Sequence, residues 1–257
     1  MEYVTICLVA LLGSGLTLFS GFGLGTILVP VFDIFFPIDM AIALTAIVHF
    51  LNNLFKLGLL GKFANKQIVL RFGIPSIVFA FIGALCLSYI TGFKPINSYL
   101  LFGKEFFITP VKVTISVLIF IFALIDLLPA LSNLNFDKKY LPLGGILSGF
   151  FGGLSGNQGA LRSAFLIRAG LSKETFIATG VVIACLTDIS RLSVYIGRIV
   201  KVSNSINYWL IILATLSAFA GAYIGNRLMK KVTVHTLQVF VGGMLILFSV
   251  ALGLGII

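Results

Sequence analysis

Long apolar runs with almost no charged residues dominate the hydropathy pattern of this chain. There are eight, at Tyr3–Phe32, Met40–Gly61, Phe72–Phe93, Val113–Leu131, Leu141–Ile167, Thr175–Gly197, Val202–Asn226 and Val232–Ile257. Six of them are close to the roughly 20 residues that one helix needs to cross a bilayer. The first is longer, since its 30 or so residues would measure about 45 Å as one straight helix, and so is the fifth. The pattern predicts an all-α polytopic membrane protein whose first and fifth segments are broken.

Glycine-rich stretches are the expected break points. The first is GSGLTLFSGFGLG at Gly13–Gly25, with Pro30 beyond it, and the second is GGILSGFFGGLSGNQG at Gly144–Gly159. Glycine releases the backbone from helical dihedral angles. We expect each stretch to join two half-helices, so that the first and fifth segments re-enter the side from which they came.

Composition excludes a soluble fold. Hydrophobic residues make up 59% of the chain and charged residues 10%, whereas soluble domains carry roughly 25% charged residues. The net charge of +10 does not indicate a nucleic-acid partner, because basic residues in the loops between apolar runs are expected from membrane orientation alone. The three cysteines (Cys7, Cys86 and Cys185) lie in apolar runs without a paired spacing, so we expect no disulfide framework, no metal site and no cofactor.

A weak internal repeat divides the chain into two halves. A shift of 135 positions superimposes Ser20 on Ser155, Asn53 on Asp188, Lys56 on Arg191 and Lys66 on Lys201. Matches at the glycine breaks and at membrane-embedded charges are typical of two-repeat transporters. We expect two transmembrane repeats of four segments each, residues 1–131 and 141–257, joined by a polar linker at 132–140.

The distribution of lysine and arginine among the loops distinguishes two topologies. If all eight runs cross the membrane, the two sides carry nearly equal numbers. If the first and fifth runs re-enter, one side collects ten basic residues and the other five. By the positive-inside rule the side with ten faces the cytoplasm, both termini face outward, and the repeats are inverted. Parallel repeats are the alternative.

Three basic residues, Lys56, Arg162 and Arg191, lie inside apolar runs, where a charge costs at least about 2.5–3.5 kcal/mol. The second run carries a polar stripe at helical spacing, made of Thr45, His49, Asn52, Asn53 and Lys56. The sixth run carries a similar stripe, made of Thr187, Asp188, Arg191 and Tyr195. Since neither stripe is suited to lipid, we expect both to line a polar cavity between the repeats, which is the candidate substrate site.

Structural roles for these charges are the competing interpretation. Asp188 and Arg191 stand three positions apart and could simply neutralise each other, as could Asp188 and Lys56 across the halves. Lys56 could also extend toward the membrane surface. His49 and Asp188 are the candidates for coupling transport to protons, but a lone histidine is more often a hydrogen-bonded packing residue. Arg162 has no acidic neighbour in sequence, which favours a role in binding.

The glycine breaks add a second feature suited to anions. A half-helix that starts inside the membrane presents unpaired N–H groups and the positive end of its dipole. The residues that would do so are Ser20, Gly21 and Gly23 in the first half and Ser155, Gly156, Asn157 and Gln158 in the second. The alternative is that these glycines only allow helices to pack closely.

These stretches, GSGLTLFSGFGLGTILVP at Gly13–Pro30 and GGILSGFFGGLSGNQGALRSAFL at Gly144–Leu166, resemble the sulfite exporter (TauE/SafE) family of membrane permeases. The resemblance covers nearly the whole chain. It implies a two-repeat transporter that moves small sulfur-containing anions, such as sulfite or organosulfonates, out of the cell. The chain departs from the family's usual run of three glycines followed by proline, because Leu24 interrupts the first run and Asn157-Gln158 replaces the second.

Together these features predict a secondary transporter that binds a small anion near the bilayer midplane between its repeats. Two alternatives remain: an anion channel, and a permease for another anion such as a carboxylate. An intramembrane enzyme is disfavoured, because no HExxH or GxSxG motif accompanies His49 and Asp126. The expected partners are the anionic substrate and the lipid bilayer, and the expected location is a bacterial inner membrane.

Overall fold

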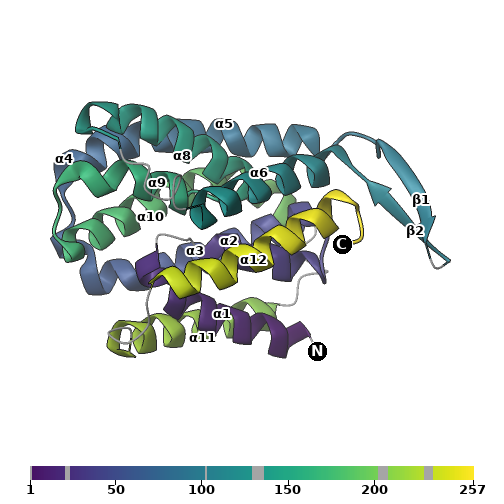
Figure 1. Ribbon diagram of the computed structural model, residues 1–257, viewed down its shortest axis with the longest axis horizontal. Coiled ribbons are helices and arrows are strands. Elements are labelled where there is room, and N and C mark those ends of the chain that lie inside the picture. Colours follow the sequence, from purple (N-terminus) through teal and green to yellow (C-terminus); the bar gives the residue numbers. More distant parts are fainter. Residues whose placement is uncertain (1, 21–23, 102, 129–135, 202–207, 229–233) are drawn as a thin grey trace.

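The computed structural model of the protein is a bundle of helices that run roughly along one long axis (Figure 1). It describes residues 2–20, 24–101, 103–128, 136–201, 208–228 and 234–257. The helices are α1 (Glu2–Ser20), α2 (Leu24–Asp33), α3 (Ile38–Leu60), α4 (Lys66–Ile68), α5 (Ile74–Ile90), α6 (Pro110–Leu127), α8 (Leu141–Ser155), α9 (Gly159–Leu166), α10 (Lys173–Lys201), α11 (Tyr208–Leu228) and α12 (Val234–Gly253). A π-helical turn at Val69–Gly73 links α4 to α5, and 3-10 turns lie at Gly61–Phe63, Lys138–Tyr140 and Ile167–Ala169.

Several of these helices suit a bilayer in length and composition. Within the described residues, four stretches are long and apolar enough to cross it: Ile38–Phe63, Lys66–Ile90, Lys173–Gly197 and Tyr208–Gly225. Shorter apolar helices accompany them at Glu2–Leu16, Leu24–Asp33, Pro110–Ile125 and Gly242–Gly253. Large hydrophobic side chains cover the outside, for example Leu247 at 75% exposure, whereas Asp188 and Arg191 are both fully buried. This distribution is the reverse of a soluble protein's and matches the expected helical membrane protein.

A glycine-lined contact joins α8 to α5 and to the π-helical turn that precedes α5. Glycines recur on α8 at four-residue spacing, at Gly145, Gly149 and Gly153, and a Cβ atom on them would overlap the carbonyls of Phe72, Ser76 and Ala80 respectively. A similar contact joins α1 to α11, where a Cβ atom on Gly221 would overlap the Leu11 carbonyl. Small residues allow this close backbone approach in membranes. In both cases a helix from the first half of the sequence is held against one from the second.

The first and fifth apolar runs each contain two helices. α8 ends at Ser155, Gly156 adopts the left-handed conformation (φ 81°), and α9 begins at Gly159. α9 folds back along α8, since Gly144 near the start of α8 faces Phe165 near the end of α9. α2 returns in the same way along α1, so that Gly13 faces Leu24. The turn between α1 and α2 lies outside the described residues, and re-entry into a bilayer stays a prediction.

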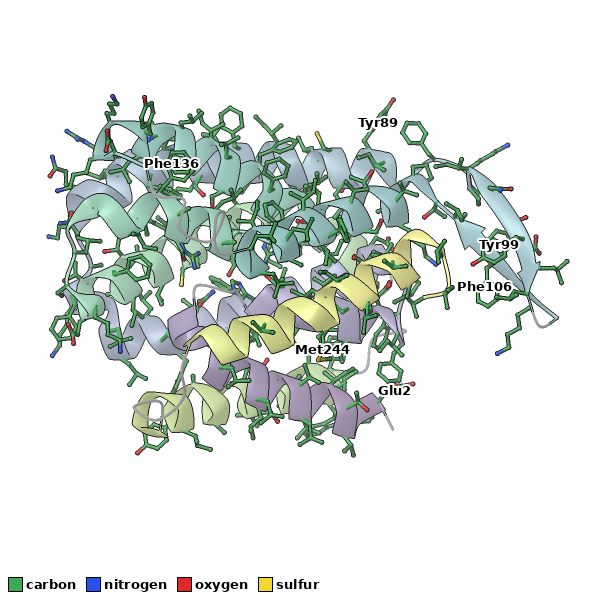
Figure 2. All side chains as sticks on the ribbon, in the orientation of Figure 1. Glu2, Tyr89, Tyr99, Phe106, Phe136 and Met244 are labelled. Atoms are coloured by element: carbon green, nitrogen blue, oxygen red, sulfur yellow. The ribbon has the colours of Figure 1, made fainter. Side chains whose placement is uncertain are left out.

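A β-hairpin, which the all-α expectation missed, projects from the bundle between α5 and α6 (Figure 1). β1 (Asn97–Leu101) pairs antiparallel with β2 (Lys104–Ile108), with Tyr99 opposite Phe106. These two rings stack with centroids 5.6 Å apart, and Tyr99 Oη donates to the Leu254 carbonyl at 2.7 Å (Figure 2). The hairpin lies at the same end of the bundle as both chain termini.

Candidate functional site

The polar stripes on α3 and α10 face each other in the interior of the bundle, where these two helices pack together. α3 contributes His49 and Asn53, one turn apart, and α10 contributes Asp188 and Arg191, also about one turn apart. All four side chains are buried. The helical spacing seen in the sequence therefore produces one shared polar cluster, with residues drawn from both halves of the chain.

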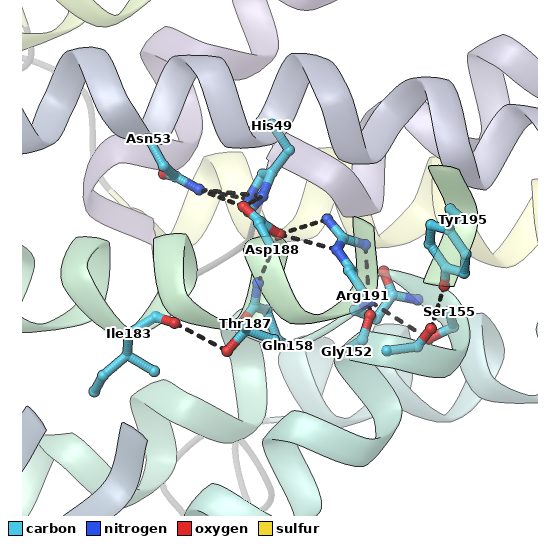
Figure 3. A network of polar contacts seen from close by, with 12 residues as sticks. His49, Asn53, Gly152, Ser155, Gln158, Ile183, Thr187, Asp188, Arg191 and Tyr195 are labelled. Carbon is cyan, nitrogen blue, oxygen red and sulfur yellow. Dashed lines mark hydrogen bonds and ion pairs between the residues drawn. The ribbon is translucent and has the colours of Figure 1, made fainter. Parts of the chain in front are cut away.

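Asp188 is the centre of this cluster (Figure 3). Its Oδ2 lies 2.7 Å from His49 Nδ1 and accepts a hydrogen bond from Asn53 Nδ2 at 3.2 Å. Its Oδ1 accepts from Arg191 Nε at 2.9 Å and lies 2.7 Å from Arg191 Nη2. Gln158 Nε2 donates to the same oxygen at 3.4 Å. Because charge-assisted contacts of this kind stabilise the ionised form, Asp188 is held as a carboxylate.

Arg191 also closes the broken end of α8. Its Nη1 donates to the Gly152 carbonyl at 3.4 Å, and the Tyr195 hydroxyl donates to the Gly153 carbonyl. The last carbonyls of a helix lack partners within it and carry the negative end of the dipole, so a cation there is favourable. Arg191 thus contacts both a carboxylate and a helix end.

Lys56, one turn beyond Asn53 on α3, has a different environment. It is 6% exposed, and it does not form the ion pair with Asp188 that was considered from the sequence. With the Asn52 amide oriented to satisfy its neighbours, Oδ1 accepts from Lys56 Nζ at 3.1 Å and Nδ2 donates to the Ala218 carbonyl at 3.3 Å. The side chain of Lys56 is buried in the bundle, and the partner found for its charge is a neutral amide.

Arg162 stands in the first turn of α9, and its backbone N–H donates to the Gln158 carbonyl at 3.1 Å. Its guanidinium lies over Gly180 of α10, since a Cβ atom there would be 3.4 Å from Arg162 Nε. Arg162 Nη1 is buried without a hydrogen-bond partner. Lys56 and Arg162 lie within electrostatic range of each other, and in the described part of the chain neither forms an ion pair with a carboxylate.

The segment between α8 and α9 lies beside the start of α2. A Cβ atom on Gly156 would be 3.1 Å from Arg191 Nη1, and one on Gly25 would be 3.2 Å from the Gly156 carbonyl and 3.8 Å from His49 Cδ2. Ser155 Oγ donates to the Phe151 carbonyl at 2.9 Å. The Ser155 hydroxyl hydrogen is therefore used within its own helix, although the sequence suggested Ser155 as a donor to the anion, and its oxygen accepts from the Asn157 N–H at 3.4 Å.

The structure brings together most of the residues selected from the sequence. Those found in or beside the cluster are His49, Asn52, Asn53, Lys56, Ser155, Gly156, Asn157, Gln158, Arg162, Asp188 and Arg191. Gly21, Gly23 and the side chain of Ser20 lie outside the described residues. Asn157 and Gln158 are 4% and 1% exposed.

Sequence reasoning missed two contributors. Cys185, interpreted only as a core residue, stands one turn before Asp188 on the same face of α10 and within electrostatic range of Arg162 and Lys56. Ser148 holds the break from the α8 side, because its Oγ donates to the Gln158 carbonyl at 3.0 Å. The three-residue spacing of Cys185, Asp188 and Arg191 was the available signal for the first. Nothing local in the sequence indicates the second.

Comparison with known proteins agrees with this architecture. Neither a curated protein nor a solved structure matches the chain. The model of one family, described as sulfite exporter TauE/SafE, matches residues 6–252 of the 257. That match includes all the helices of the polar cluster and both glycine-rich segments. The protein is accordingly an integral membrane protein of the sulfite exporter TauE/SafE family, which comprises transporters of sulfur anions rather than enzymes.

Proposed function

We propose that this protein is a secondary transporter that exports a small sulfur-containing anion, such as sulfite or an organosulfonate, across a bacterial inner membrane. The observation that carries the proposal is the pair of cations Lys56 and Arg162: Lys56 is buried, Arg162 has a buried Nη1 without a hydrogen-bond partner, and neither forms an ion pair with a carboxylate among the described residues. A buried charge without a counter-ion is costly. An anionic substrate would supply the missing charge.

The three cations are assigned different roles because their contacts differ. Three basic groups, Lys56, Arg162 and Arg191, surround one carboxylate, and that carboxylate contacts Arg191 twice. Arg191 therefore acts mainly as a positioning residue that holds Asp188 and the end of α8. Lys56 and Arg162 are the residues assigned to the substrate oxygens, with Asn157 and Gln158 beside them at the helix break.

The packing of helices supports two repeats around this site. The helices of the first half, α1, α2, α3, α5 and α6, can be matched in order with those of the second half, α8, α9, α10, α11 and α12. Under this matching the contact between α5 and α8 corresponds to the contact between α11 and α1. The contact between α3 and α10 and the contact between α6 and α12 each correspond to themselves. Such an exchange is what a twofold axis between the halves produces. With α2 and α9 folded back, each half has three crossing elements, which fits inverted repeats. His49 stands near the middle of α3 (Ile38–Leu60), a depth that fits a substrate site close to the bilayer midplane.

Proton coupling belongs to the same proposal. His49 Nδ1 lies 2.7 Å from Asp188 Oδ2, and imidazole is the side chain that most readily changes charge near neutral pH. A protonated His49 would compete with Arg191 for Asp188 and so free a cation for the substrate. Transport would then depend on the pH gradient.

The test is flux of labelled sulfite into proteoliposomes, competed with sulfate, a sulfonate and a carboxylate, with and without a pH gradient. Saturable flux that the sulfonate inhibits and the gradient accelerates is the expected result. Flux that does not saturate would indicate a channel instead. Flux of the carboxylate alone would overturn the assignment to sulfur anions.

Arg162→Ala is the sharpest variant. A charge-assisted hydrogen bond contributes about 1.5–3 kcal/mol, so losing it should weaken substrate affinity about 10- to 100-fold. Lys56→Met should act in the same direction. Arg71→Ala is the matched control, because Arg71 is exposed and distant in sequence from the cluster. Wild-type flux through the Arg162 variant would remove that residue from the binding site.

A further inference from the structure

Polar atoms without partners are concentrated in the segment that separates α8 from α9. Neither Asn157 Nδ2 nor Asn157 Oδ1 has a hydrogen-bond partner, and Gln158 Oε1 has none. Both residues are more than nine-tenths buried. A buried polar group left unpaired costs about 1–3 kcal/mol, so three such atoms on adjacent residues point to a ligand that pairs with them.

The chemistry of these atoms is fixed by their neighbours. Asp188 is a carboxylate, because Arg191 contacts its Oδ1 through Nε and Nη2. A carboxylate only accepts hydrogen bonds, so the Gln158 amide must turn its nitrogen toward Asp188 and its oxygen away. Asn157 supplies one donor and one acceptor whichever way its amide is turned. Two buried amide oxygens therefore remain as acceptors without a partner, and Arg162 Nη1 is a buried donor without one.

Gln158 and Arg162 share one face of the chain. The Arg162 N–H donates to the Gln158 carbonyl, so the two residues are four apart on the first turn of α9, where side chains are neighbours. A ligand held by the Arg162 guanidinium is thus close to the acceptor on Gln158, and Asn157 directly precedes Gln158 in the chain. A ligand that only accepts hydrogen bonds, such as sulfate or an alkyl sulfonate, would leave both amide oxygens unpaired.

Building on the transport function proposed above, we propose that the site selects oxyanions of single charge that also carry a hydrogen-bond donor, namely an acid proton or a hydroxyl group. Hydrogen sulfite and hydroxyl-bearing sulfonates belong to this class. The anionic oxygens contact Arg162 and Lys56, while the donor pairs with an amide oxygen of Asn157 or Gln158. A site that pairs with a substrate hydroxyl rejects an analogue without it far more strongly than an apolar pocket rejects an extra methylene, because the buried acceptor is left unpaired.

The experiment compares 2-hydroxyethanesulfonate with 1-propanesulfonate, which replaces the hydroxyl by a methyl group at the same charge. Both compounds stay monoanionic across neutral pH, so a difference between their affinities does not come from a difference in protonation. Binding is measured on the purified full-length protein as the concentration of each sulfonate that gives half of its maximal thermal stabilisation. The hydroxyl compound should reach this point at a concentration at least about tenfold lower, and sulfate should give little stabilisation. Asn157→Leu should bring the ratio between the two sulfonates close to one.

The outcomes separate the two proposals. Equal or tighter binding of 1-propanesulfonate by the wild-type protein overturns donor selection and leaves anion transport standing. If neither sulfonate nor sulfite stabilises the protein, both proposals are overturned. Because the wild-type comparison needs no variant, the conclusion does not depend on whether Asn157→Leu folds.

Discussion

Removal of the Asp188 charge is the most informative perturbation of the polar cluster. Asp188→Asn preserves shape but leaves Arg191, which is 0% exposed, without its only counter-ion among the described residues. Removing one partner of a buried ion pair costs about 3–5 kcal/mol. In a protein of this size, 1 kcal/mol shifts the melting temperature by about 2–4 °C. We therefore expect the purified variant to melt about 6–20 °C below the wild type in the same detergent.

The double variant Asp188→Asn/Arg191→Met separates loss of charge from loss of shape. With both charges gone, most of the stability should return, less about 1 kcal/mol for the hydrogen bond from Arg191 to the Gly152 carbonyl. Glu105→Gln on the exposed hairpin is the control for a change of net charge and should be nearly neutral. Two results would refute a dry, paired Asp188–Arg191 contact. One is a melting temperature of the single variant equal to that of the wild type, and the other is a melting temperature of the double variant below that of the single variant.

Two further predictions concern the architecture. Gly149→Val should prevent recovery of monodisperse protein, because a side chain there would overlap the Ser76 carbonyl, whereas Gly243→Ala, with open space around it, should be recovered at wild-type yield by size-exclusion chromatography. Epitope tags inserted at 32–39 and at 204–207 should both label from outside intact cells, and labelling only after permeabilisation would contradict inverted repeats.

Helix positions were largely predictable because they depend on a local requirement. A segment that crosses lipid needs about 20 residues without charge, and α3 at Ile38–Leu60 closely matches the predicted run Met40–Gly61. The error at the third run has a simple cause: the predicted run begins at Phe72, whereas helical structure begins at Lys66. Charged residues end a hydropathy run, but they do not interrupt backbone hydrogen bonds at an exposed helix start.

Features that depend on distant residues were not predictable. The hairpin is stabilised by the cross-strand stack of Tyr99 on Phe106 and by the bond from Tyr99 to Leu254, 155 positions away. The roles of the three cations were equally unpredictable from the sequence. Arg191 and Lys56 occupy equivalent positions in the proposed repeats, yet among the described residues only Arg191 contacts the open end of α8 and the Asp188 carboxylate. Periodicity placed both on the correct helix faces and could not tell which would be neutralised.

That asymmetry bears on why a symmetric scaffold would carry an asymmetric site. If both equivalent cations were paired, Arg162 alone would remain to attract an anion, which would gain less by leaving water. If neither were paired, the protein would bury three like charges and an anion would be slow to leave. With Arg191 held by Asp188 and with Lys56 and Arg162 unpaired in the described residues, the site attracts an anion while a carboxylate and a histidine remain close enough to compete for a cation. This balance between binding and release is what a transport cycle requires.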